Sequence, residues 1–325
     1  MTVGGWALRR LLLALPVVLG VTTLTFALIH LAPGDPVYLL GGDGGSASYY
    51  ADMRVKFGLD RTLVEQFARY ARAALTGDFG YSFTYESPVS AVIARHAPAS
   101  ILLGTAALLL SLLGGVCLAL VPTQWPWRGL DAAISVASAV IYSAPVFWTG
   151  QILIIVVAVH LGLLPVGGMT TARETLGGVR LALDVATHLI LPAVTLSLPF
   201  MAVVARVTRA SLRDAMREPF IQAAAARGLS RPRVVFRHAA PHAAVALTTL
   251  IGQHAPQIVA GAAITEYLFG WPGLGSAVLH ASLHRDYPLV TSSFLIISTA
   301  VVCSSALSDA VCAWLDPRDP SLVRP

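Results

Sequence analysis

Long apolar segments with few or no charges constrain this chain more than any other feature of its sequence. Residues 100–121 contain no charged side chain, and a helix needs about 20 apolar residues to cross the hydrocarbon core of a bilayer. Only 12% of all residues are charged and the mean hydropathy is +0.71, whereas a soluble domain usually has about 25% charged residues. We therefore expect an integral membrane protein.

Several further segments meet the same length criterion, and together they predict an all-α membrane protein with six transmembrane helices. The predicted spans are 11–29, 100–121, 132–164, 188–205, 243–265 and 289–307. The third is long enough to be tilted or broken, and Pro145 is the expected break. The first apolar run is too long for a secretory signal, so we expect it to be retained.

The distribution of charge predicts the orientation. Residues 206–237 hold eight arginines against Asp214 and Glu218, whereas residues 31–98 hold six basic and seven acidic side chains. Because basic loops stay in the cytoplasm, both termini are predicted to be cytoplasmic. The net charge of +5 arises mainly in this loop, so it reflects membrane orientation and not nucleic-acid binding.

This orientation divides the chain into regions. They are an N-terminal segment with the first span (1–30), an external region (31–98), a core of five spans (99–315) that contains the cytoplasmic loop 206–242, and a cytoplasmic tail (316–325). Apolar residues at helical spacing within residues 60–75 predict that the external region is small and mostly helical.

The cytoplasmic loop contains the stretch "QAAAARGLSRPRVVFRHAAP", residues 222–241. Pro219 suits the first turn of a helix, where a missing N–H costs nothing, and the alanines that follow favour helix. Gly228 is able to adopt the left-handed conformation that ends a helix. Ser230 is placed to N-cap a second helix, which Pro241 is expected to close before the fifth span.

Two roles fit such a loop. A short helix with an alanine face lets another surface approach its backbone closely, and arginines make charge-assisted contacts with acidic groups. These features predict a docking site for a cytoplasmic partner. The alternative is a helix on the membrane surface whose arginines meet anionic lipids.

The same stretch resembles the EAA loop of ABC-importer permeases, which has the pattern E-A-A, three residues, G, and then I-x-L-P ten residues on. Residues 222–224 stand at E-A-A, Gly228 at the glycine and residues 238–241 at I-x-L-P. Gln222 replaces the glutamate and His238 the isoleucine. The resemblance implies that ATPase coupling involves Pro219, Gln222, Ala223, Ala224, Arg227, Gly228, Arg231, Arg233, His238 and Pro241.

Further blocks resemble the dipeptide, oligopeptide and nickel permease family, and most of all the first of its two permease subunits. In order they are "HLAPGDPV" (30–37), "FGLDRTLVEQFARY" (57–70), "TGDFGYSF" (76–83), "SAPVFWTGQILI" (143–154), "LGLLPVGG" (161–168), "EYLFGWPGLG" (266–275) and "LDPRDP" (315–320). Each block alone is weak, but their joint occurrence between the right spans is specific. The resemblance implies a type I ABC-importer permease fold in a bacterial inner membrane.

Permeases of this kind pair with a second, related permease, two cytoplasmic ATPases and an external substrate-binding protein. The resemblance implies that this chain forms half of a pathway for dipeptides or oligopeptides, and that ATPase closure moves the helix at 219–228 to reverse the access of the cavity. This chain has no G-x-x-x-x-G-K-[ST] loop, so ATP and Mg²⁺ are expected in the partner ATPases and no cofactor in the chain itself.

Polar side chains within the spans are the candidates for lining the cargo pathway, because burying a polar group in lipid is costly. They are Tyr142, Ser143 and Gln151 in the third span, and Gln253, His254 and Gln257 in the fifth. The alternative role for the residues of the fifth span is hydrogen bonding to the second permease.

The segment after the fifth span supplies candidates for an external gate, namely Glu266 and Trp271. The alternative for Glu266 is a side chain that simply faces water. His280 and His284 have a spacing that suits a metal, but no complete ligand set accompanies them, so we expect surface histidines and no metal site.

Other function classes fit the sequence less well. A membrane protease would need a motif such as G-x-S-x-G or H-E-x-x-H, and the sequence has neither. A secondary transporter or channel would carry charged residues at mid-depth in its spans, and the predicted spans have none there. Peptides are the expected cargo, with nickel chelates, glutathione and other small solutes as alternatives.

Overall fold

The computed structural model describes residues 16, 19–27, 46–57, 60–124, 128–171 and 177–315, without the side chains at 252–261, 307–315 and a few other helical positions. The chain divides into two compact units. The first comprises Met1–Pro98 and Ala277–Val302, and the second comprises Ala99–Ser276 and Cys303–Pro325.

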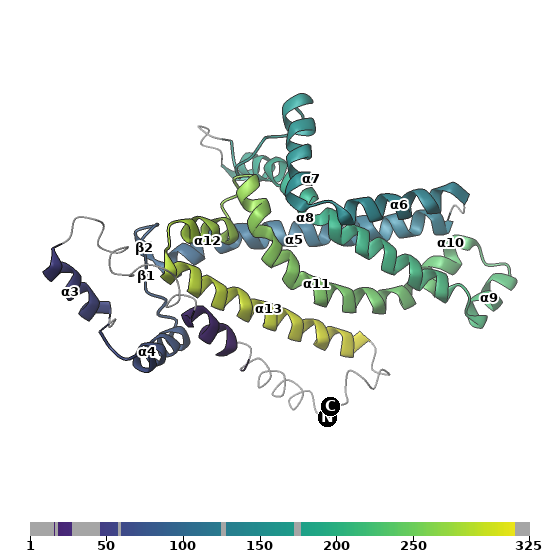
Figure 1. The fold of residues 1–325 in the computed structure, drawn as a ribbon. Helices are drawn as coiled ribbons and strands as arrows, with labels where there is room; N and C mark the ends of the chain where they lie inside the picture. The colour runs from purple at the N-terminus through teal and green to yellow at the C-terminus, as the bar shows by residue number, and fades with distance from the viewer. Residues whose placement is uncertain are drawn as a thin grey trace. The chain divides into compact units, whose positions relative to one another are not determined.

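Most of the described elements are helices, as Figure 1 shows. In chain order the elements are α3 (Ala47–Phe57), α4 (Leu63–Thr76), β1 (Tyr81–Ser82), β2 (Ser87–Pro88), α5 (Val89–Gln124), α6 (Arg128–Ser143), α7 (Val146–Leu153), the π-helix η1 (Ile154–His160), α8 (Gly178–Ala215), α9 (Pro219–Ala226), α10 (Arg231–Val234), the π-helix η2 (Val235–Ala239), α11 (Ala240–Leu268), α12 (Leu274–Leu283) and α13 (Tyr287–Leu315). Residues 19–27 are also helical.

Three described helices are long and apolar enough to cross a membrane, namely α5, α8 and α13, and the bent pair of α6 and α7 makes a fourth if it is one span. The predicted spans 100–121, 188–205 and 289–307 lie within these three helices, and the predicted span 243–265 lies within α11. Most of the first predicted span, 11–29, lies outside the described residues. The apolar helices confirm the prediction of a mainly helical membrane protein.

In the first unit, α4 confirms the helix that was predicted near residues 60–75. The N–H of Thr62 donates to Glu65 Oε2 at 3.3 Å, and the N–H of Glu65 donates to Thr62 Oγ1 at 3.4 Å. This reciprocal pair is a capping box, which satisfies two N–H groups that would otherwise lack partners at the start of the helix.

The first unit also contains a hairpin that was not expected from the sequence. Strands β1 and β2 pair antiparallel, with Ser82 opposite Ser87. Asp286 is buried and accepts hydrogen bonds from Ser82 Oγ at 2.5 Å and from the N–H of Thr84 at 3.0 Å. The carboxylate therefore links the hairpin to the start of α13.

In the second unit, α8 packs against α11, α6 and α7. Its side chains Phe200 and Val204 share an apolar core with Leu103 of α5. A β-carbon on Gly115 of α5 would lie 2.6 Å from Val204 Cβ and 2.8 Å from the carbonyl oxygen of Met201. Small residues of this kind let membrane helices approach closely, so α5 and α8 pack backbone to backbone at this point.

The third predicted span is broken at the predicted place. Helix α6 ends at Ser143, Pro145 directly precedes α7, and the two helices are bent by 105°. A proline has no N–H for the helical hydrogen-bond ladder, and its ring clashes with the preceding turn. The change to π-helical geometry in η1 was not predicted.

The prediction that Pro241 closes the second helix of the loop is wrong. Helix α10 begins at Arg231 as predicted, but the chain stays helical through η2, and Pro241 lies in the first turn of α11. The N–H of Ala240 bonds to the carbonyl of Val235, five residues back. This wider turn gives the proline ring room that an α-turn lacks.

Candidate functional site

The first helix that the sequence predicts within the basic loop is α9, and both of its predicted ends are confirmed. Pro219 is the first helical residue. The helix ends before Gly228, whose φ is +81°, a conformation that strains any residue with a β-carbon. The glycine turns the chain so that α10 can begin three residues later.

One face of α9 is held against the ends of neighbouring helices. Ile221 is 1% exposed and Ala224 is also buried. Ile221 belongs to an apolar cluster with Leu212 of α8, Val234 of α10 and Ala243 of α11. A displacement of α9 therefore acts directly on α8 and α11.

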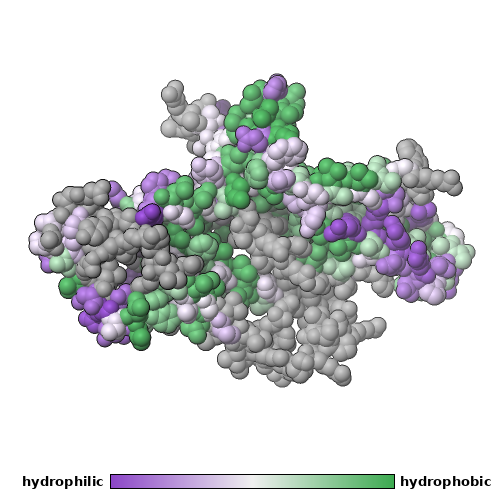
Figure 2. Space-filling model, in the orientation of Figure 1, coloured by the Kyte–Doolittle hydropathy of each residue, from purple (hydrophilic) through white to green (hydrophobic). Residues whose placement is uncertain are grey.

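The opposite face of α9 is exposed. Ala223 and Arg227 are exposed there, and Phe220 is 50% exposed although it is a large aromatic residue. Figure 2 shows hydrophilic side chains gathered over α9 and α10 at this end of the unit. The two alanines of the motif thus differ, because Ala224 packs inward and Ala223 is available to a partner.

Gln222, which stands where the family pattern has glutamate, makes a contact within the loop. Its Nε2 donates to the carbonyl oxygen of Arg217 at 3.1 Å. This carbonyl follows the C-terminal end of α8, where carbonyl groups lack helical partners. An ionised glutamate has no N–H and would be unable to make this bond.

The arginines of the second half of the loop do not share one role. Arg231 donates from Nε to the main-chain carbonyl of Thr123 at 2.8 Å. Thr123 lies near the C-terminal end of α5, where the helix dipole also favours a cation. Arg227, Arg233 and Arg237 are exposed. Arg231 therefore links α10 to α5, while the other three are available to a partner.

Two further residues of the loop were named in the sequence predictions, Ser230 and His238. Ser230 occupies the predicted N-cap position of α10, but its side chain makes no capping hydrogen bond within the described structure. His238 lies in η2 and is partly buried.

The structure describes the candidate pathway residues of the third predicted span only. Tyr142 is 55% exposed, and the Arg206 guanidinium lies 5.7 Å from the centroid of its ring. Ser143 donates from Oγ to the carbonyl of Ala139 at 2.8 Å, and Gln151 is exposed. The side chains of the candidates in the fifth predicted span, Gln253, His254 and Gln257, lie outside the described residues.

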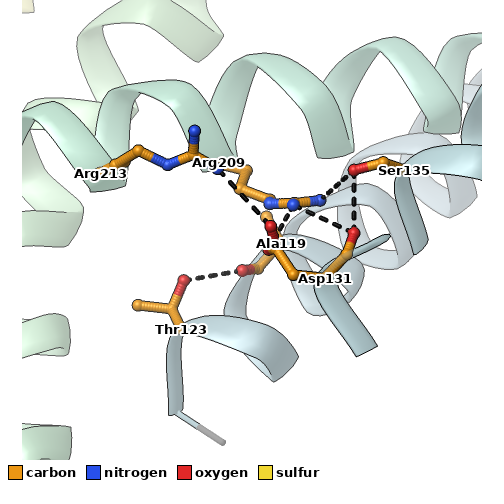
Figure 3. A network of polar contacts seen from close by, with 6 residues as sticks. All are labelled: Ala119, Thr123, Asp131, Ser135, Arg209 and Arg213. Carbon is orange, nitrogen blue, oxygen red and sulfur yellow. Dashed lines mark hydrogen bonds and ion pairs between the residues drawn. The ribbon is translucent and has the colours of Figure 1, made fainter. Parts of the chain in front are cut away.

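A polar network joins α6 to α8, as Figure 3 shows. Arg209 forms an ion pair with the Asp131 carboxylate. It also donates to Ser135 Oγ at 3.0 Å and to the Asp131 carbonyl at 3.1 Å. Arg213 lies 3.7 Å from the second carboxylate oxygen of Asp131. The Arg209 side chain is only 11% exposed, so these contacts replace the water that it loses.

Glu266 is fully buried, so the alternative in which it faces water is wrong. Its Oε1 accepts a hydrogen bond from Ser100 Oγ at 2.5 Å, and its Oε2 accepts one from the N–H of Ser276 at 2.9 Å. Ser100 Oγ in turn accepts from the N–H of Leu274 at 2.7 Å. The carboxylate therefore holds the turn between α11 and α12 from inside.

The other gate candidate, Trp271, is also fully buried, and its Nε1 donates to the carbonyl of Ala99 at 2.9 Å. A β-carbon at Gly273 would lie 2.2 Å from Glu266 Cδ, so only glycine lets this turn close around the carboxylate. The gate role stays a prediction. The contacts show that Glu266 and Trp271 support the turn.

The histidine pair of the first unit lies at the end of α12. The ring centroids of His280 and His284 are 4.3 Å apart, and His284 Nδ1 lies 2.8 Å from the His280 carbonyl. Among the described residues, no group of three histidine, cysteine or carboxylate side chains is arranged to hold a metal ion.

Three residues that contribute to these sites were not predicted from the sequence, namely Ser100, Asp131 and Phe220. A serine or a lone carboxylate at the end of an apolar helix gives no indication of a partner far along the chain. The sequence did contain a signal for Phe220. Adjacent residues on a helix project in different directions, so Phe220 and Ile221 on the eight-residue helix α9 do not share one buried face.

Comparison with known proteins decides the family. Residues 111–318 match the family described as "Binding-protein-dependent transport system inner membrane component", and residues 5–104 match the N-terminal region of such membrane components. The chain belongs to this permease family. The resemblance predicted from the sequence is thereby confirmed.

Curated relatives match along almost their whole length. The dipeptide transport system permease protein DppB of Escherichia coli (strain K12) is 33% identical over 329 residues, which cover 96% of this chain and 97% of the relative. The oligopeptide transport system permease protein AppB of Bacillus subtilis (strain 168) is 32% identical over 314 residues, 96% of this chain and 98% of the relative.

A third relative has a similar name. The di/tripeptide transport system permease protein DppB of Pseudomonas aeruginosa (strain UCBPP-PA14) is 36% identical over 331 residues, 95% of this chain and 97% of the relative. Members of this family are membrane components of transport systems and not ATPases, which agrees with the lack of a phosphate-binding loop in the sequence.

Proposed function

We propose that this chain is one of two permease subunits of an ABC importer for dipeptides and oligopeptides. The observation that carries the proposal is α9, whose apolar face is buried against α8, α10 and α11 while its opposite face is exposed. This is the arrangement that a coupling helix needs. The names of the relatives, all peptide transport permeases, support peptides as the cargo.

The proposed topology has six spans in a bacterial inner membrane, with both termini in the cytoplasm. Contacts between distant segments support it, because each joins ends that this topology puts on the same side. Arg231 and Thr123 join two cytoplasmic ends. Glu266 and Ser100 join two external ends.

The proposed complex contains a second, related permease, two cytoplasmic ATPases and an external substrate-binding protein. The exposed face of α9 and the exposed arginines of the loop are the proposed ATPase contacts. ATP and Mg²⁺ bind the ATPases in this arrangement, since this chain has no phosphate-binding loop.

Coupling follows from the packing of α9. When the ATPases close, they shift α9, and the shift passes through Ile221 to Leu212 of α8 and Ala243 of α11. Closely packed interiors transmit such shifts because they have little free volume to absorb them. Movement of the two helices then changes the access of the central cavity from one side of the membrane to the other.

The test is purification of the chain from its native membrane in mild detergent, with co-purifying proteins identified by mass spectrometry. We expect a second permease and ATPases with phosphate-binding loops. Isolation of the chain alone or as a homo-oligomer, even after crosslinking in the membrane, would contradict the proposal.

The cargo needs a separate test. The purified complex and its binding protein are reconstituted in liposomes, and ATP-dependent uptake of a labelled dipeptide is measured. An excess of unlabelled dipeptide should abolish the uptake of label, whereas a nickel chelate or glutathione should leave it unchanged. If the nickel chelate or glutathione competes and the unlabelled dipeptide does not, the competing compound is the cargo and the peptide proposal is wrong.

A further inference from the structure

A groove of about 220 Å³ lies between α6 and α8. Its lining has two parts. Ile134, Ala139 and Val203 contribute apolar surface, and Arg206, Arg209 and Arg213 contribute guanidinium groups. Positions 206, 209 and 213 are three and four residues apart, so they lie on one face of α8.

The groove has an excess of positive charge. Among the described residues that line it there are three arginines and no carboxylate. One neighbouring carboxylate, Asp131, serves both Arg209 and Arg213 (Figure 3). It contacts Arg209 more closely than Arg213, whose Nη2 lies 3.7 Å from Asp131 Oδ2. The network therefore neutralises one of the three guanidinium groups.

Arg206 takes no part in this network. It is exposed, and its guanidinium lies over the ring of Tyr142 at 5.7 Å from the centroid. No carboxylate of the described residues forms an ion pair with it. When an aromatic ring lies beneath a guanidinium, the N–H groups at the edge of the guanidinium still point outward, and they can bind an anion in a bidentate manner.

The position along α8 selects the kind of anion. The arginines directly follow the apolar segment 188–205, which places them at the cytoplasmic interface in the topology proposed above. The apolar part of the groove includes Ala202 and Val203, at the end of that segment. A ligand that fills both parts has an apolar chain within the membrane and a negative charge at its surface.

We propose that this groove binds an anionic phospholipid, with its phosphate between Arg206 and Arg213 and an acyl chain along the apolar lining. Basic pockets between membrane helices on the cytoplasmic side are suited to such head groups, and the guanidinium fork matches the oxygens of a phosphate. This inference rests on the proposed topology, but it does not depend on the ATPases or on the cargo.

The test uses the full-length chain, purified in detergent and exposed to phosphatidylglycerol or phosphatidylcholine. Bound lipid is counted by native mass spectrometry. We expect wild-type protein to retain phosphatidylglycerol in preference to phosphatidylcholine, and Arg206→Gln to lower that preference roughly tenfold, the effect of losing a charge-assisted hydrogen bond. Arg206→Lys should keep part of it, because it keeps the charge and loses the fork.

The matched control is Arg217→Gln, which removes an exposed arginine that does not line the groove. It should leave the lipid preference unchanged. Equal losses in Arg206→Gln and Arg217→Gln, or equal retention of the two lipids by wild-type protein, would overturn the proposal.

A third measurement distinguishes the lipid from cargo. If the dipeptide displaces phosphatidylglycerol, or if Arg206→Gln raises the KM for dipeptide uptake and leaves lipid retention unchanged, the groove is a cargo site and the lipid proposal is wrong. Retention of lipid by a chain that co-purifies with no ATPase would instead support this inference while the proposed function failed.

Discussion

Arg231 of α10 donates a hydrogen bond from Nε to the main-chain carbonyl of Thr123, near the end of α5, at 2.8 Å. The two residues are 108 positions apart, and they connect the loop that carries α9 with a helix that packs closely against α8. This contact gives Arg231 a structural role that the exposed Arg227, Arg233 and Arg237 do not share. The structural and the docking contributions of the basic patch can therefore be measured independently.

The first prediction concerns this contact. Arg231→Gln should lower the free energy of unfolding by about 1 kcal/mol, less than a buried charged hydrogen bond contributes, because the side chain is exposed. Thermal unfolding of the purified chain measures the change. Arg233→Gln, an exposed neighbour without this contact, is the control, and an equal loss in both variants would contradict the assigned role of Arg231.

The second prediction concerns ATPase attachment. Arg233→Glu should weaken binding of the ATPases roughly tenfold at low salt without changing the stability of the permease, and the difference from wild type should shrink as salt screens the charges. Binding of the purified ATPases to the permease at several salt concentrations measures this. Unchanged binding would favour lipid as the partner of Arg233.

The third prediction concerns the turn after α9. Gly228→Val should abolish ATP-dependent dipeptide uptake while the chain still inserts in the membrane, because a left-handed conformation costs about 1–2 kcal/mol for a residue with a β-carbon, and more when it is β-branched. The control is Gly129→Val, since a β-carbon at Gly129 has no neighbour within 4 Å and its φ is not left-handed. Normal uptake by Gly228→Val would contradict the role given to this turn.

The fourth prediction concerns the buried carboxylate of the turn between α11 and α12. Glu266→Gln should lower the free energy of unfolding by about 1–3 kcal/mol, because the amide would present an N–H group to one of the two donors, Ser100 Oγ or the N–H of Ser276. Glu218→Gln, at an exposed position, should have little effect. Equal stability of the two variants would show that the carboxylate is not needed in this turn.

The parts of the loop that follow local rules were predicted well from the sequence. The start of α9 at Pro219 and its end before Gly228 depend on backbone constraints that each residue carries with it. The break before α7 at Pro145 is of the same kind. Pro241 was the exception, because the change to π-helical hydrogen bonding in η2 is not specified by the residue types of that segment.

The burial of Glu266 could not be predicted in the same way. Its partner Ser100 is 166 positions away, and nothing near the glutamate in sequence indicates that a hydroxyl will face it. Asp131 and Arg209 are likewise 78 positions apart. Contacts of this kind depend on which helix ends meet, and a single sequence does not specify that.

In the proposed complex, the exposed face of α9 contacts the ATPases. The most direct test places a photoreactive benzoylphenylalanine at Phe220, which is 50% exposed on α9, or at Leu163, which is 69% exposed and lies on the external side in the proposed topology. After illumination in the membrane, the Phe220 variant should crosslink to an ATPase subunit and the Leu163 variant should not. Absence of an ATPase crosslink from Phe220, in cells that make the whole complex, would contradict the claim.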